Sequence, residues 1–112
     1  MPLRPGQRAE QRAVWWYRLR CYRILATNAW VAGYELDIIV RRGRRLIFCE
    51  VKEKLGDRFG DPLAMVDDEK QRRLRLAADA WLARHPETNG LHVSFDVIAV
   101  RSGRLERVAE AF

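Results

Sequence analysis

Two strand-like runs joined by a short basic loop lie near the middle of the chain, and they read YELDIIV (residues 34–40), RRGRR (41–45) and LIFCEVK (46–52). Isoleucine, valine, tyrosine and phenylalanine are enriched in β-strands. Gly43 readily adopts the positive φ that a tight hairpin turn needs. The stretch therefore predicts a β-hairpin, and the rest of the fold is built around it.

The turn of this hairpin sets which residues face each other. A two-residue turn at residues 43–44 places Asp37 opposite Glu50, with Lys52 on the same face, whereas a longer loop would shift this register. The opposite face is then wholly apolar and consists of Leu36, Ile38, Val40, Ile47, Cys49 and Val51. A slip of one residue would mix the charged and apolar sets, which favours the shorter turn.

The opposed carboxyl groups of Asp37 and Glu50 carry an electrostatic cost. Directly opposed residues have Cβ atoms about 5 Å apart, and like charges at that separation repel by about 3 kcal/mol at an effective dielectric constant near 20. Lys52 supplies a single positive charge. Protonation of one acid, or a divalent cation such as Mg²⁺, would relieve the repulsion. A solvated surface network is the alternative, although Ile39 and Phe48 on the same face indicate partial cover.

The remaining sequence predicts two helices and three more strands. The expected elements are a helix at residues 7–20, a strand at 22–27, a connector at 28–33, a loop at 56–62, a helix at 67–84, and strands at 91–100 and 105–108. Asp67 is a suitable N-cap for the second helix. The element order is αβββαββ, which predicts an α/β fold with a mixed β-sheet flanked by helices.

Each predicted helix carries one charged residue on an otherwise apolar stripe. The first helix aligns Glu10 with Ala13, Val14, Tyr17 and Cys21, and the second aligns Lys70 with Leu74, Ala77, Ala78 and Trp81. Glu10 is the member of its stripe that does not suit a core.

Aromatic side chains cluster in and after the first predicted helix. Trp15, Trp16, Tyr17 and Trp30 could stack on nucleic-acid bases, but Trp16 and Tyr17 are better suited to a core. Trp15 is the better candidate for an exposed role, for example at a subunit contact. Asp96 lies in a predicted strand and fits a structural or supporting role.

Size and composition predict a single domain over residues 1–112. The chain is 48% hydrophobic and 32% charged, as in ordinary globular proteins. No apolar run approaches the roughly 20 residues of a membrane helix, and residues 1–8 lack the apolar stretch of a secretory signal, so we expect a cytoplasmic location without membrane contact. Cys21 and Cys49 have no metal-ligand spacing, and reduced thiols are expected in that compartment.

The basic excess is concentrated in the N-terminal third. The net charge is +6, of which residues 1–34 contribute +5, residues 35–66 contribute +1 and residues 67–112 contribute nothing. A basic surface attracts phosphate, but it also serves as an ordinary solvated face. Charge alone leaves both interpretations open.

The hairpin motif resembles the core of PD-(D/E)xK nucleases, in which an aspartate and an acid-x-lysine triplet converge on a metal. More closely, the chain resembles the UPF0102 (YraN-like) family, which is similar to archaeal Holliday junction resolvases. The residues that carry the resemblance are Gly6-Gln7-Arg8-Ala9-Glu10, Asn28, residues 35–39, residues 48–52, Phe59-Gly60-Asp61-Pro62, Lys70 and residues 95–98.

This resemblance implies a restriction-endonuclease-like fold and a Mg²⁺- or Mn²⁺-dependent catalytic site. Asp37, Glu50 and the main-chain carbonyl of Val51 would hold the metal, and Glu10 would complete the acidic cluster. Lys52 would orient the attacking water and stabilise charge on the phosphate. These are expectations for a metal-dependent endonuclease.

The resemblance also implies a nucleic-acid partner, with DNA favoured over RNA and branched or junction DNA as the substrate. Basic residues expected to contact nucleic acid are Lys70, Arg8, Arg12 and Lys54. A lysine that snorkels from a helix start is an equal alternative for Lys70. Junction-resolving relatives act as dimers, so a homodimer is a further possibility.

The chain departs from the family pattern at two positions. Leu36 stands where the motif has proline, and Tyr34 intervenes between Gly33 and the Glu-x-Asp segment. Neither change removes a proposed ligand. Two alternatives to an endonuclease stay open: a non-catalytic nucleic-acid-binding module on the same scaffold, and a protein-interaction domain with a solvated charge network.

Overall fold

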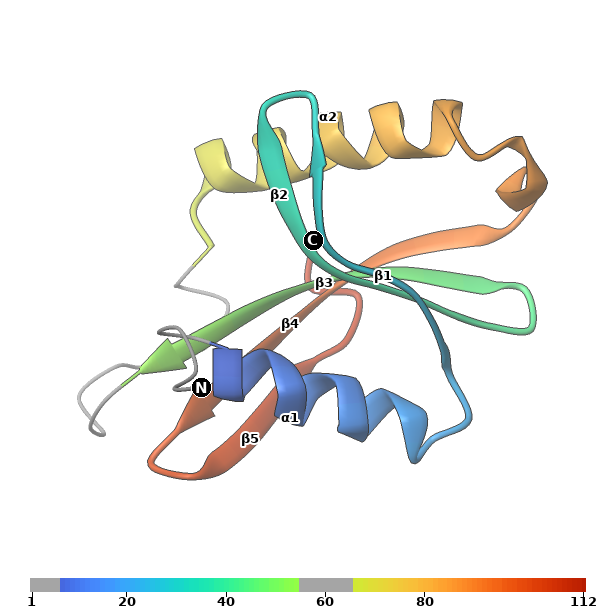
Figure 1. Ribbon diagram of the computed structural model, residues 1–112. Coiled ribbons are helices and arrows are strands. Elements are labelled where there is room, and N and C mark those ends of the chain that lie inside the picture. Colours follow the sequence, from blue (N-terminus) through green and yellow to red (C-terminus); the bar gives the residue numbers. More distant parts are fainter. Residues whose placement is uncertain (1–6, 55–65) are drawn as a thin grey trace.

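The computed structural model describes residues 7–54 and 66–112, which form one sheet and two long helices (Figure 1). The elements are α1 (Gln7–Arg18), β1 (Arg23–Val31), β2 (Tyr34–Arg42), β3 (Arg45–Lys54), α2 (Asp68–Ala83), a 3₁₀ turn (Pro86–Thr88), β4 (His92–Arg101) and β5 (Arg104–Val108). The predicted order αβββαββ and the α/β class are confirmed. The predicted loop at 56–62, with its Phe59–Pro62 motif, and Gly6 lie outside the described residues.

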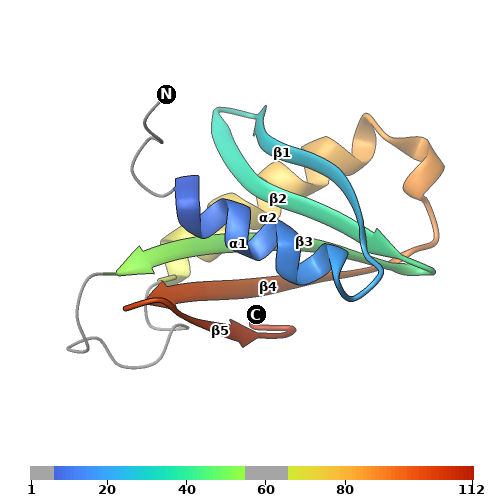
Figure 2. The ribbon, with the colours of Figure 1, turned by 60° about the horizontal axis from the view of Figure 1, so that its bottom comes forward.

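The sheet is mixed, as predicted. Its five strands lie in the order β1-β2-β3-β4-β5, with β3 and β4 parallel and every other neighbouring pair antiparallel. The helices cover opposite faces of the sheet, with α1 on one side and α2 on the other (Figures 1 and 2). Among the described residues, no helix combines the length and the apolar character needed to span a bilayer.

Each helix packs on its own apolar core. The core on the α1 face contains Ala9, Ala13, Tyr17, Tyr22, Ile38, Val40, Ile47, Cys49, Ile98 and Val100. The core on the α2 face contains Val31, Leu36, Ile39, Leu46, Phe48, Val66, Leu74, Ala77, Ala78, Trp81, Phe95 and Val97. The sheet is therefore buried on both faces, which explains why its central strands are so rich in apolar residues.

The hairpin has the predicted register. Arg42 pairs with Arg45 and Ile39 with Phe48, around a turn in which Gly43 has φ +59°. Main-chain pairing extends as far as Ile38 with Cys49. The next predicted pair, Asp37 and Glu50, lies beyond this main-chain pairing. There the side chain of Asp37 bonds to β3 instead, and its carboxylate accepts a hydrogen bond of 2.9 Å from the main-chain N–H of Val51.

One residue of the predicted apolar face is on the other side. Leu36 was expected beside Ile38 and Val40 on the α1 face, but it packs in the α2-side core with Ile39. Residues two apart in a regular strand share a face. The alternation of β2 therefore changes at Asp37, where main-chain pairing with β3 stops.

The first half of the chain differs from prediction in two further places. Residues 28–31 were expected in a connector but continue β1, and the turn is confined to residues 32–33. The strand persists because its residues pair with β2, as Ala29 does with Leu36. Cys21 was expected on the helix stripe, but α1 ends at Arg18 and the chain turns with φ +67° at Cys21, which leaves this thiol exposed.

Candidate metal centre

Glu50 is the most buried charged group at the end of the β2–β3 hairpin, with 6% of its surface exposed. Its Oε1 atom lies 3.3 Å from the Nζ of Lys52 and 3.3 Å from the Nζ of Lys70. Its Oε2 atom is buried and has no hydrogen-bond partner, and it is the one such side-chain atom in residues 7–54 and 66–112. A buried carboxylate oxygen without a donor is unfavourable, and a hydrogen-bond donor or a cation would stabilise it.

Asp37 lies against Glu50. Burial, the negative charge of Glu50 and that of Glu10 raise the pKa of Asp37 to about 8, against a lowering by the hydrogen bond from Val51. At neutral pH, and with no cation bound, the Asp37 carboxyl therefore holds a proton for most of the time. A divalent cation would replace that proton and stabilise both carboxylates in their ionised form.

A third and a fourth carboxylate complete the cluster. Oxygens of Glu10, Glu35 and Asp37 lie within 4.8 Å of one another. Asn28 holds two of them, since its Nδ2 donates to Glu10 at 3.0 Å and to Glu35 at 2.7 Å. Asn28 has φ +50°, a left-handed conformation that asparagine tolerates better than most residues. With this backbone conformation, the side-chain amide of Asn28 reaches both Glu10 and Glu35.

The cluster fits a hard divalent cation in charge and in size. Four acidic groups (Glu10, Glu35, Asp37 and Glu50) face two basic ones (Lys52 and Lys70), which leaves two negative charges uncompensated when all ionise. In octahedral Mg²⁺ coordination, ligand oxygens on opposite sides lie about 4.2 Å apart. The oxygens of Glu10, Glu35 and Asp37 all lie within 4.8 Å of one another, an upper limit close to this distance.

The two lysines differ in how firmly they hold their protons. Burial lowers the pKa of Lys52, but the contacts with Lys70 and Glu50 outweigh burial and raise the net pKa. Burial and the nearby Lys52 charge lower the pKa of Lys70. Lys70 is placed by the start of α2, where the predicted N-cap Asp67 accepts a 2.8 Å hydrogen bond from the main-chain N–H of Lys70.

The structure thus brings together Glu10, Asp37, Glu50, Lys52 and Lys70 of the predicted site residues. The main chain of Val51 is also at the cluster. Its N–H contacts Asp37, and in a strand the carbonyl of the same residue points toward the same neighbour.

The predicted arginine contacts lie elsewhere on α1. Arg8 and Arg12 are exposed and line a separate groove with Trp16 and Leu105, and the Arg12 guanidinium donates to the carbonyl of Gly103. Lys54 ends β3, and its side chain lies outside the described part of the structure.

Sequence reasoning gave no role to Glu35 or Asn28. A signal for Glu35 was present, because Glu35 and Asp37 are two residues apart and share a face in a regular strand. Asn28 is one of the residues that carry the family resemblance, but its spacing suggested no role because its segment was assigned to a connector.

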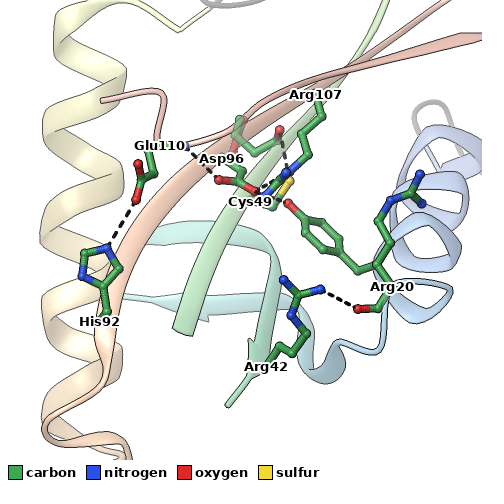
Figure 3. Close-up of polar contacts among 9 residues, drawn as sticks. Arg20, Arg42, Cys49, His92, Asp96, Arg107 and Glu110 are labelled. Atoms are coloured by element: carbon green, nitrogen blue, oxygen red, sulfur yellow. Dashed lines mark hydrogen bonds and ion pairs between the residues drawn. The ribbon is translucent and has the colours of Figure 1, made fainter. Parts of the chain in front are cut away.

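Asp96 is a second buried acid with a different role (Figure 3). It is 1% exposed, and its Oδ2 accepts hydrogen bonds of 2.7 Å from the Tyr17 hydroxyl and 2.9 Å from Arg107, while its Oδ1 accepts one of 3.1 Å from the main-chain N–H of Glu110. Both oxygens therefore have donors. Asp96 ties α1, β4 and β5 together, in contrast to Glu50 with its unpartnered oxygen.

The fold and the site define a class of small α/β proteins, in which a mixed sheet carries a buried carboxylate–lysine cluster at the end of its central hairpin. A match to the family described as "Uncharacterised protein family UPF0102" covers residues 9–100. The chain belongs to the UPF0102 family.

Relatives in this family come from several bacteria. A UPF0102 protein of Bartonella bacilliformis is 36% identical over 107 residues, covering 96% of this chain and 86% of the relative. One from Rhizobium etli is 39% identical over 105 residues (94% and 84%), and one from Mycolicibacterium vanbaalenii is 43% identical over 106 residues (94% and 85%). The similarity thus extends over nearly the full length of both partners.

Proposed function

We propose that this protein is a Mg²⁺- or Mn²⁺-dependent endonuclease that hydrolyses phosphodiester bonds in DNA and acts in the cytoplasm. The observation that carries the proposal is the buried, unpartnered Oε2 of Glu50 beside an Asp37 whose pKa is raised to about 8. Two acids held in this way, next to a lysine, form a site that is stable once a divalent cation is bound.

The residues divide into ligands and groups that act on the substrate. Asp37, Glu50 and the carbonyl of Val51 would hold the metal, with Glu10 and Glu35 completing the acidic cluster. When bound, the cation would supply charge stabilisation for the phosphoryl oxygens and lower the pKa of a coordinated water. The raised pKa of Lys52 keeps its ammonium group protonated, so Lys52 can orient the water and stabilise negative charge on the phosphate.

DNA is favoured as the substrate by charge and by the family resemblance. The basic excess lies in residues 1–34, which contain α1 and β1, beside the cluster. The likeness of the motif to junction-resolving nucleases favours branched DNA. Cutting both strands of a junction requires two active centres, which a homodimer would supply.

The test is cleavage of a labelled four-way junction and of a linear duplex, with Mg²⁺, Mn²⁺ or EDTA. Cleavage should require the metal. Lys52→Ala should lower the rate by about 10²- to 10³-fold, as expected for loss of a group that stabilises transition-state charge. Glu50→Gln should abolish cleavage because it removes a ligand. Glu53→Gln is the matched control, since Glu53 is an exposed acid on the same strand and should leave the rate unchanged.

Two results would contradict the proposal. Cleavage that persists in EDTA, or that is unchanged in Lys52→Ala, removes the metal mechanism. Salt-sensitive DNA binding without products, unchanged by Glu50→Gln, identifies a non-catalytic nucleic-acid-binding module instead.

A further inference from the structure

A groove runs between α1 and β1 next to the carboxylate cluster. Its volume is about 410 Å³, within the range of small-ligand sites. The residues that shape it include Glu10, Gln11, Val14, Trp15 and Arg18 from α1, and Asn28 from β1. Most of the helix residues recur at intervals of three or four, so one stripe of α1 forms a continuous wall.

The groove is continuous with the candidate metal centre. Glu10 and Asn28 line the groove and also belong to the cluster, where Asn28 donates to Glu10 at 3.0 Å. A phosphate positioned at the cluster would therefore have its neighbouring nucleotide at the mouth of the groove.

The far end of the groove is built for stacking. Trp15 is 58% exposed, which is unusual for so large an apolar side chain. The guanidinium carbon of Arg18 lies 5.4 Å from the centre of the Trp15 ring, and Val14 adds an apolar surface. An indole flanked by a guanidinium presents both a π-face for a base and a positive charge for a phosphate.

The spacing suits a nucleic-acid strand. Glu10 and Trp15 are five positions apart in α1, which corresponds to a rise of about 7.5 Å along the helix axis. Successive nucleotides of a B-form strand rise by about 3.4 Å. Trp15 thus lies about two nucleotide steps from the cluster.

We infer that this groove binds unpaired nucleotides of the substrate strand, with a base stacked on Trp15 about two nucleotide steps from the phosphate that is cleaved. A base within a duplex is stacked and paired on its own strand and must leave the helix to enter a protein pocket. The preferred substrate therefore carries single-stranded nucleotides next to the cleavage position. This inference rests on the proposed function, because it takes the carboxylate cluster as the place of the phosphate.

The experiment measures binding of three DNA probes by fluorescence anisotropy: a blunt duplex, the same duplex with a single-stranded overhang, and the overhang strand alone. The buffer contains Ca²⁺, which binds oxygen ligands like those of the cluster, and a gel verifies that the probes stay intact. Trp15→Ala should weaken binding of the two probes with unpaired bases by roughly fivefold to 100-fold. Binding of the blunt duplex should be unchanged.

The control is Trp30→Ala, which removes a tryptophan that is 69% exposed on β1 and is absent from the groove lining. Trp15→Phe should restore part of the affinity because the phenyl ring still stacks. Equal loss for all probes, no loss for any, or equal effects of the Trp15 and Trp30 changes would each overturn the groove assignment. So would a wild-type protein that binds none of the probes.

Cleavage assays separate this inference from the proposed function. If Trp15→Ala leaves binding unaffected while metal-dependent cleavage continues, the groove assignment fails and the endonuclease stands. If binding depends on Trp15 but no DNA is cut with Mg²⁺ or Mn²⁺, the endonuclease fails and the groove stands as a single-strand site.

Discussion

Asp37 and Asp96 are both acids within the sheet, but their surroundings have opposite effects on the ionisation of the carboxyl group. Asp96 has a hydrogen-bond donor on each oxygen and an arginine beside it. Asp37 has one main-chain donor and faces another acid. The surroundings of Asp96 stabilise its ionised carboxylate and the fold, whereas the surroundings of Asp37 disfavour its ionisation.

The raised pKa of Asp37 predicts how stability depends on pH. The ordinary value is 3.8 and the folded value is about 8, so between these limits the folded protein binds more protons than the unfolded chain. The free energy of unfolding of the metal-free protein should therefore fall as pH rises from about 4 to about 8. In Asp37→Asn this contribution is absent.

The measurement is urea unfolding in EDTA across that pH range, for the wild type and Asp37→Asn side by side. The difference between the two should change steadily with pH, and Mg²⁺ affinity of the wild type should increase with pH because binding displaces the proton. Parallel curves for the two proteins would show that Asp37 titrates normally.

The β2–β3 hairpin was predictable from the sequence because residues within the hairpin itself determine its turn and its register. A glycine in the turn and a clean alternation of charged and apolar residues set the register of β2 and β3. The same local rule failed at Leu36, since the change of face at Asp37 arises where main-chain pairing with β3 stops. The alternation of apolar and charged residues in the sequence does not indicate where pairing between β2 and β3 ends.

The candidate site was only partly predictable for the same reason. Glu10 and Lys70 stood out as charged residues on apolar helical stripes, and Asp37, Glu50 and Lys52 followed from the hairpin. The role of Asn28 was missed because asparagine is common in turns, and its segment was therefore assigned to a connector rather than to β1. Its role depends on α1 and β2 meeting at the same point, which residue spacing does not encode.

Asn28 offers a test of how these elements are joined. Asn28→Gly keeps the left-handed backbone but removes the donor to Glu10 and Glu35, and it should lower the stability of the metal-free protein by about 1–2 kcal/mol. Asn28→Ala should cost roughly 1 kcal/mol more, because alanine disfavours positive φ. Thermal or urea unfolding measures both, with the exposed neighbour Thr27→Ala as control.

On the proposed function, saturating Mg²⁺ should reduce the stability deficit of Asn28→Gly, since a bound cation would bridge the carboxylates that the amide held. An Asn28→Gly variant as stable as the wild type in EDTA would mean that the two hydrogen bonds contribute nothing to the junction of α1, β1 and β2.

For the whole molecule, the asymmetry of charge predicts salt-dependent DNA binding. The logarithm of the affinity should fall linearly with the logarithm of salt concentration, with a slope of about −0.9 for each phosphate neutralised. Arg8→Ala should make this slope shallower by about 0.9, because Arg8 lies on the exposed face of α1. Arg84→Ala, at the end of α2 on the other side of the sheet, should leave it unchanged. A slope near zero for the wild type would exclude an electrostatic partner.

The sheet keeps two apolar cores apart, one beneath each helix. Changes in different cores, such as those at Ala13 and Ala77, lack shared neighbours and should contribute additively to folding, whereas changes within one core are interdependent. Evolution can accordingly rework one face while the other stays constant. The surface of α1 can therefore diversify while α2 continues to hold Lys70 against Glu50.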